Sequence, residues 1–358
     1  MSDDLPDIAL PDVARALTLQ AGICRRMGSP LNGDLLERAA GDWLAGGPVR
    51  ALMAPWEGLE LRAQFDAATP LRLIGSWHEL ALSGDDPAVA AGYAALDADA
   101  IWAAVSVAMV ERRERLARFM EHEPQTNEVR RSIALVGGFL EVAKATGLPL
   151  RCFEIAASAG LNLSWDRYRY RMGEASWGDP DARVSMDTAW TGGVPPVDAQ
   201  VQVIERAACD RRPTDLRDPD QRRRLVSYIW ADQTERLARI NAAIEVALAN
   251  GTHVEAADAA DWVRARVAPK AGAATVLYHS VFWQYMPHES QAALANLIAE
   301  TGAAATPEAP FAWLRMEPPG AVPVMDIRLT LWPGGTERLL GHAGAHGADV
   351  QWFGANHS

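Results

Sequence analysis

The sequence is poor in cysteine, in basic residues and in long apolar runs, and each shortage excludes a class of protein. Its three cysteines, Cys24, Cys152 and Cys209, are odd in number and far apart, so we expect neither a disulfide framework nor a C-x-x-C metal site. The 34 Lys and Arg residues face 46 Asp and Glu, a net charge of −12, which argues against broad nucleic-acid binding. The longest apolar run, residues 101–110, is too short to cross a bilayer.

What remains is an ordinary globular composition, with 49% hydrophobic and 22% charged residues over 358 positions. This length favours about two domains. Residues 1–7 are acidic and lack the basic and apolar parts of a signal peptide, so the sequence predicts a cytoplasmic protein. His342 and His346 lie four residues apart among glycines, without a cysteine or carboxylate cluster beside them, and we expect no metal site.

Residues 1–146 predict an all-α N-terminal domain. Apolar residues recur at helical spacing along 102–120 and again along 129–140, with charged residues on the other faces. The segment 124–131 gathers hydrogen-bonding side chains at a helix start. It has two interpretations, a helix cap with a solvated face, or Asn127 and Arg131 at the mouth of a substrate cleft.

The most informative stretch is residues 150–163. Leu150–Ile155 is a short, mostly apolar run, which predicts a buried strand of a parallel sheet. The acidic Glu154 is out of place in such a core. Ala156–Gly160 follow with small side chains, and residues 161–163 can begin a helix. A strand, a small-residue turn and a helix N-terminus together let backbone N–H groups approach a ligand closely.

Further stretches predict the other strands of the sheet. Residues 166–172 alternate aromatic or apolar with basic side chains, and we expect 184–190 to return as their hairpin partner, an insertion around residues 166–195. The remaining strands are expected within Gln200–Asp210, His253–Ala257, Ala273–Met286, Pro310–Glu317, Met325–Trp332, Glu337–Leu340 and Asp349–Phe353.

The spacing of Glu154, Ala156, Ser158 and Gly160 resembles the E-x-G-x-G-x-G loop of class I S-adenosylmethionine (SAM) methyltransferases, with two of three glycines replaced. In that family the small residues let the loop bend under the cofactor, and the acidic residue sits beneath it. The resemblance covers roughly residues 148–355. It implies an α/β fold in which residues 147–358 form a Rossmann-like, methyltransferase-type SAM-binding domain that follows the helical domain in the chain. Its sheet is expected to be mostly parallel, with an antiparallel C-terminal edge.

The same resemblance implies roles for individual residues. SAM would be held by the loop residues with Asn162, by Asp210 at the ribose after the second strand, by Asp258, Ala259 and Trp262 at the adenine, and by His279 and Ser280 near the methyl group. His279 or Tyr285 would deprotonate or orient the acceptor, and Asn127, Arg131, Trp283 and Gln284 would contact it. Simpler readings stay open: turn residue for Asp210, helix cap for Asp258, buried core residue for His279.

Several stretches together resemble DUF2332, a bacterial family of unknown function: Gln125–Glu128, Glu154–Tyr170, Tyr228–Gln233, Tyr278–Ser280 with Gln284–Tyr285, and Leu331–Gly335. This resemblance implies no activity. Three functions therefore stay open. The first is a SAM-dependent methyltransferase with an unknown small-molecule or protein acceptor, and the second a non-catalytic SAM- or nucleotide-binding sensor or scaffold. The third is an α/β-hydrolase-like enzyme, with Ser158, Asp258 and His346 in triad order. The sequence leaves the oligomeric state open.

Overall fold

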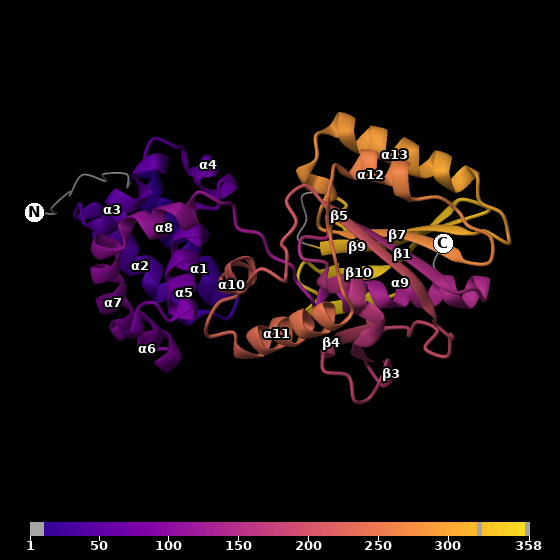
Figure 1. Cartoon of the computed structure of the whole chain (residues 1–358), viewed down its shortest axis with the longest axis horizontal. Helices are drawn as coiled ribbons and strands as arrows, with labels where there is room; N and C mark the ends of the chain where they lie inside the picture. The colour runs from indigo at the N-terminus through magenta and orange to yellow at the C-terminus, as the bar shows by residue number, and fades with distance from the viewer. Residues whose placement is uncertain (1–10, 321–323, 355–358) are drawn as a thin grey trace, which may run out of the picture. The chain divides into compact units, whose positions relative to one another are not determined.

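The structure, a computed structural model, describes residues 11–320 and 324–354, so the expectation about residues 1–7 lies outside the described residues (Figure 1). The chain is a mixed α/β protein with a large, mostly parallel sheet and many helices. It divides into two compact units, a helical unit (Met1–Thr126 and Pro219–Ala238) and a sheet unit (Asn127–Asp218 and Arg239–Ser358). In the described parts of the chain, every helix is too short or too polar to span a bilayer.

The helical unit contains helices and no strand among its described residues. Ser29 and Asp86 each accept a hydrogen bond from a backbone N–H in the first turn of the following helix, and a proline begins each of these helices. The helices bury a common core that includes Leu17, Leu35 and Trp77. They are α1 (Asp12–Arg26), α2 (Pro30–Leu44), α3 (Pro48–Met53), η1 (Ala54–Trp56), α4 (Leu61–Asp66), α5 (Thr69–Ser83), α6 (Pro87–Ala95), α7 (Ala98–Glu111), α8 (Arg113–Met120), α10 (Pro219–Ser227) and the start of α11 (Thr234–Ala249).

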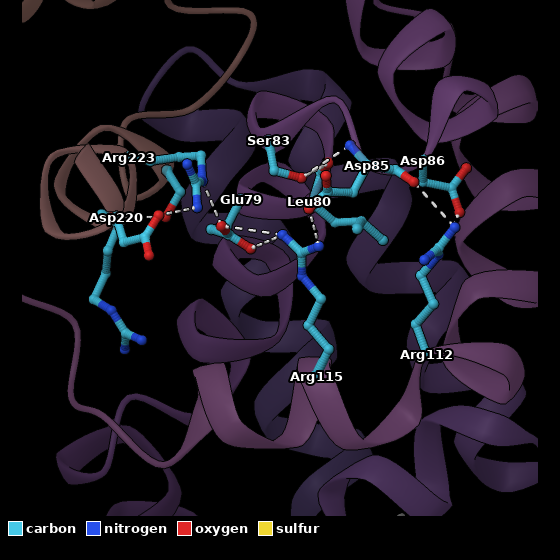
Figure 2. Close-up of polar contacts among 11 residues, drawn as sticks. Glu79, Leu80, Ser83, Asp85, Asp86, Arg112, Arg115, Asp220 and Arg223 are labelled. Carbon is cyan, nitrogen blue, oxygen red and sulfur yellow. Dashed lines mark hydrogen bonds and ion pairs between the residues drawn. The ribbon is translucent and has the colours of Figure 1, made fainter.

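A buried carboxylate ties α10 into this unit although α10 comes about a hundred residues later in the chain. Glu79 on α5 is 8% exposed. It accepts hydrogen bonds from Arg115 Nη2 of α8 at 3.1 Å and from Arg223 Nε of α10 at 2.6 Å. Arg115 also pairs with Asp85, and Arg223 with Asp220 (Figure 2). One acidic side chain thus joins three helices.

The strands of the sheet unit form one sheet in the order β3-β2-β4-β11-β10-β9-β8-β7-β1-β5-β6. Neighbours from β6 to β8 all run parallel, whereas β8, β9, β10 and β11 form an antiparallel series. The strands are β1 (Leu150–Ile155), β2 (Arg169–Met172), β3 (Ala175–Trp177), β4 (Ser185–Gly192), β5 (Val203–Asp210), β6 (Glu255–Ala256), β7 (Ala274–Ser280), β8 (Phe311–Glu317), β9 (Val324–Trp332), β10 (Thr336–Gly344) and β11 (Asp349–Trp352).

Two expectations about strand pairing need correction. Residues 184–190 do not return as a hairpin partner, because β4 pairs in parallel with β2 and the hairpin partner is β3. The chain reverses at once after Met172, where Gly173 has the left-handed φ of 64° that a tight turn requires. The antiparallel C-terminal strands also do not end the sheet, since β11 pairs in parallel with β4 and the insertion strands continue beyond it.

Helices cover both faces of the sheet. Figure 1 shows α12 (Ala259–Arg266) and α13 (His288–Ala303) on one face and α9 (Arg131–Thr146) on the other. Helix α9, expected in the helical domain, packs on β7, β8 and β9 and belongs to the sheet unit. Its apolar stripe alone does not tell which partner it covers.

Close approach of α9 to the sheet depends on Gly137. A Cβ there would lie 2.4 Å from Cη2 of the Trp352 indole. We expect Gly137→Ala to lower the free energy of unfolding by about 1–2 kcal/mol, because overpacking outweighs the gain in helix propensity. Gly41→Ala in α2 is the matched control, since open space surrounds that position, and it should stabilise by about 0.5–1 kcal/mol. Urea unfolding of both variants compares them, and a stabilised Gly137→Ala would contradict this packing.

Candidate site at the carboxyl ends of the strands

The strand order reverses at β1, with β5 and β6 on one side and β7 and β8 on the other. In parallel α/β sheets, ligands bind outside the carboxyl ends of the strands at such a reversal. Glu154, Asp210 and Ser280 lie at the carboxyl ends of β1, β5 and β7. The residues around these strand ends therefore form the candidate site.

The loop after β1 has an unusual backbone. Ala156 and Ser158 both have φ of 55°, and Gly160 has 73°. This left-handed conformation costs a non-glycine residue about 1–2 kcal/mol, and such strain gathers at functional sites. The loop thus has a backbone conformation typical of glycine at two positions occupied by alanine and serine.

Two side chains that were expected to contact a ligand, Asp210 and Asn127, hydrogen-bond to the backbone of this loop. Asp210 Oδ2 accepts the Ser158 N–H at 2.8 Å, and its Oδ1 accepts the Arg212 N–H at 2.8 Å. Asn127 is 6% exposed, and its Oδ1 accepts the Leu161 N–H at 2.8 Å. Both side chains stand beside the loop and position its backbone, and their contact with a ribose or a substrate stays a prediction.

Glu154 lies beneath the loop and is 2% exposed. Burial, with the nearby Asp210 carboxylate, raises the pKa of Glu154 from 4.5 to about 8, and Tyr278 and Arg131 oppose this only in part. The Tyr278 hydroxyl lies 3.3 Å from Glu154 Oε2 and 3.3 Å from the Asn162 carbonyl oxygen. A carboxyl group that is mostly neutral at pH 7 therefore lies at the strand reversal.

Two buried polar atoms near the loop lack a partner. Ser158 Oγ and Asn162 Oδ1 make no hydrogen bond to any residue that the structure describes. The Asn162 Nδ2, by contrast, donates to the Glu128 carbonyl oxygen at 3.3 Å. Most buried polar atoms in proteins are hydrogen-bonded, so these two are available to a ligand or to water.

His279 is fully buried and both its nitrogens have partners. Nδ1 lies 2.6 Å from Glu317 Oε1, and Nε2 accepts the Trp313 indole N–H at 3.1 Å. The ring also stacks on Trp283. His279 thus matches the reading of a satisfied core histidine, and it would have to lose a hydrogen bond before it accepted a proton.

A carboxylate at the end of β8 fixes the segment that follows β7. The Glu317 carboxylate accepts the N–H groups of Phe282 and Trp283 at 3.0–3.1 Å. Gln284 and Tyr285 are exposed, Tyr285 by 75%. Glu317 is absent from the residues expected at the site, although its signal in the sequence is the same as that of Glu154, an acidic residue at the end of a buried strand.

The residues after β6 confirm the helix-cap reading of Asp258. Asp258 is exposed and accepts the Ala260 N–H at 2.9 Å as the cap of α12, while Ala259 begins that helix. Trp262 is 3% exposed and packs on Phe153 in the core, and its contact with a ligand ring stays a prediction. A cavity of about 350 Å³ opens beside the loop, lined by Ala159, Pro213, Thr214, Asp215, Leu216, Thr252, His253, Val254 and Ala256.

Arg131 joins two strand ends across the site. Its Nε donates to the Ala345 carbonyl oxygen at 3.0 Å, in the turn between β10 and β11, and its Nη1 to the Ser280 carbonyl oxygen at 3.5 Å. The guanidinium is half-buried and near enough to Glu154 to lower its pKa. A positive charge thus lies beside the end of β7.

A match to a known protein family extends over residues of both units. The profile of a family described as "Uncharacterized protein conserved in bacteria (DUF2332)" matches residues 14–352. The chain belongs to the DUF2332 family. No curated protein and no solved structure is significantly similar to it.

Residues 127–128, 154–163 and 278–280 of the stretches that resemble DUF2332 lie around the site, and 228–233 lie in the helical unit, whereas 331–335 lie at the opposite edge of the sheet, where Trp332 pairs with Phe311 at the start of β8. Asn127 holds the loop, and Tyr278 contacts Glu154. In the helical unit, Asp232 accepts the Ser29 hydroxyl at 2.6 Å and the Leu31 N–H at 3.1 Å. Groups of three or more residues suited to a metal ion are absent from the described residues.

Proposed function

We propose that the sheet unit of this DUF2332 protein binds SAM over the loop 156–160 and acts as a SAM-dependent methyltransferase on a small-molecule or protein acceptor. The observation that carries the proposal is the left-handed backbone at Ala156, Ser158 and Gly160, directly after the first strand of the sheet. The strand order β6-β5-β1-β7-β8 supports it, since it is the 3-2-1-4-5 order of Rossmann-like nucleotide-binding sheets.

The residues around the loop fit such a ligand. Ser158 Oγ and Asn162 Oδ1 are buried and unpartnered among the described residues, and the hydroxyl and amino groups of SAM can satisfy them. Glu154 would face the positive end of the ligand and Asp210 would keep the loop in shape. When bound, SAM supplies a methyl group on a sulfonium leaving group, so the chain's main task is to position the acceptor and exclude water.

Two other functions, a non-catalytic sensor and a hydrolase, agree with fewer of these observations. A non-catalytic sensor draws support from His279, whose two nitrogens are engaged. A hydrolase needs a base beside Ser158, whose Oγ has no hydrogen-bond partner in the described part of the chain, and Asp258 caps α12. The hydrolase fold also needs strands before the nucleophile, whereas β1 is the first strand that the structure describes.

Calorimetric titration with SAM and with S-adenosylhomocysteine tests the proposal. Gly160→Ala should weaken both ligands at least about tenfold, roughly 1.4 kcal/mol, because its Cβ would lie 2.9 Å from Thr252 Cγ2 and Val254 Cγ2 at a φ of 73°. Gly147→Ala is the control, with a φ of 64° at the far end of α9 and no neighbour within 4 Å. The proposal fails if millimolar SAM gives no heat with the unchanged protein.

A further inference from the structure

The turn between β10 and β11 packs directly on the segment that precedes α9. A Cβ on Gly347 would lie 2.5 Å from the Arg130 carbonyl oxygen, and Gly347 has a φ of 66°. The Ala345 carbonyl oxygen accepts Arg131 Nε at 3.0 Å, and the Gly347 carbonyl oxygen accepts the Thr188 hydroxyl of β4 at 2.7 Å. The turn is therefore fixed, and so is the residue at its centre, His346.

His346 has a buried carboxylate behind it. Its Nδ1 lies 3.9 Å from Glu128 Oε2, and the exposed fractions of the two side chains are 45% and 5%. Glu128 Oε1 accepts the Arg130 N–H at 3.1 Å, which fixes the carboxylate. This distance is longer than a hydrogen bond, and catalytic pairs often tighten to hydrogen-bond distance when a ligand binds.

This pair lies beside the proposed SAM loop. The Glu128 carbonyl oxygen accepts Asn162 Nδ2 at 3.3 Å. On the other side, Arg131 links the Ala345 carbonyl oxygen to that of Ser280 at the end of β7, with distances of 3.0 and 3.5 Å. His346 thus belongs to the same rim as the loop and the strand end where the acceptor is expected.

The other histidines of the rim are less suited to accept a proton. His279 is 0% exposed with both nitrogens bonded. His342 has its own carboxylate, since Nδ1 lies 3.0 Å from Asp326 Oδ1. It is within β10, however, whereas Arg131 links the turn that contains His346 to the end of β7.

We propose that His346, oriented by Glu128, is the catalytic base of the proposed methyl transfer, so the inference rests on the proposed function. His346 Nε2 takes the proton from the acceptor's O–H, N–H or S–H group. The acceptor atom forms a bond to the methyl carbon, and the electron pair of the broken carbon–sulfur bond goes to the sulfur, which changes from sulfonium to thioether. The products are the methylated acceptor, S-adenosylhomocysteine and protonated His346.

Nuclear magnetic resonance titration of the histidine rings tests this without an acceptor. Among the described residues, Glu128 lies 3.9 Å from His346, and Arg130 and Arg131 lie beside its neighbours Gly347 and Ala345. The positive charge of the sulfonium must also lower the pKa of a base that lies close to the methyl group. With SAM bound, the pKa of His346 should be lower by at least about 0.5 pH unit than with neutral-sulfur S-adenosylhomocysteine, as expected for a unit charge within about 8 Å. The pKa of His342 should be the same in both complexes.

Variants separate the possible outcomes. Glu128→Gln keeps an oxygen for the Arg130 N–H but removes the charge, so it should lower the pKa of His346 by at least about 0.5 pH unit. His346→Gln assigns the resonance, and His342→Gln should leave the His346 shift intact. If both ligands bind and the pKa of His346 is equal in the two complexes, or does not respond to Glu128→Gln, the inference is overturned while SAM binding stands. Failure of both ligands to bind overturns the proposed function, and the inference with it.

Discussion

Replacing Glu154 with glutamine should raise the free energy of unfolding at pH 8 by about 2–4 kcal/mol and leave it nearly unchanged at pH 4.5. The pKa of Glu154 is raised from 4.5 to about 8 by burial in the folded, ligand-free protein. Below about pH 4.5 the carboxyl is neutral in both states. Between pH 4.5 and 8 only the unfolded chain ionises, so the stability that the neutral carboxyl contributes is lost progressively as pH rises. Glutamine is neutral throughout and avoids this loss.

Urea unfolding at pH 4.5, 6 and 8 measures the effect. The matched control is Glu205→Gln on the neighbouring strand β5, where the Arg151 guanidinium lowers the pKa of the carboxyl. This control should act in the opposite direction and by at most about 1 kcal/mol, because the Glu205 side chain is 41% exposed. A Glu154→Gln variant that is less stable than the unchanged protein at pH 8 would show that the carboxylate is compensated.

The same substitution distinguishes a structural from a binding role of Glu154. A sulfonium above the loop favours the ionised carboxylate, so the unchanged protein should release a proton on binding SAM. Its affinity for SAM should then rise with pH between about 6 and 8. Glu154→Gln should remove this dependence and weaken SAM more than S-adenosylhomocysteine. A variant that is more stable but binds SAM more weakly would show that Glu154 lowers stability for the sake of binding, a common trade-off at functional sites.

Replacing Glu79 with glutamine should lower the free energy of unfolding of the helical unit by about 2–3 kcal/mol. The substitution leaves Arg115 and Arg223 without their shared carboxylate, and their side chains are each only 27% exposed. Because Arg223 lies on α10, amide hydrogen exchange should rise first in residues 219–227. Urea unfolding and exchange mass spectrometry measure the two effects.

The matched control for Glu79 is Asp85→Asn, which removes another partner of Arg115. The Asp85 side chain is 58% exposed, so its loss should cost at most about 1 kcal/mol. Equal effects of the two substitutions would mean that burial of Glu79 adds nothing. Unchanged exchange in residues 219–227 would mean that α10 is held by its apolar contacts alone.

Local signals predict the central part of the fold well. Leu150–Ile155 is a strand as expected from a short apolar run before small residues. Strands β5, β7 and β8 fall within their expected stretches, and β9 begins one residue before its expected stretch. The loop could be identified from Glu154 and the small side chains after it. Its left-handed backbone at Ala156 and Ser158 is a finding of the structure, since neither residue type requires that conformation.

Features that depend on distant partners could not be predicted. The hydrogen-bonding state of His279 depends on Trp313 and Glu317, which come 34 and 38 residues later. The face of the sheet that α9 covers depends on Gly137 meeting Trp352 on β11. Helical and strand periodicity report which side of an element is apolar, and they contain no information about which other element covers it.

The division of the helical unit into two chain segments has a consequence for synthesis. Tyr228, Trp230 and Ala231 lie in the same core as the helices of the first 126 residues, and Arg223 completes the contacts of Glu79. While the ribosome is still making the first five strands, the N-terminal helices lack these groups, and the space they fill stays open to water. We therefore expect the growing chain to need protection from aggregation until about residue 231 has emerged, although the helices were made first.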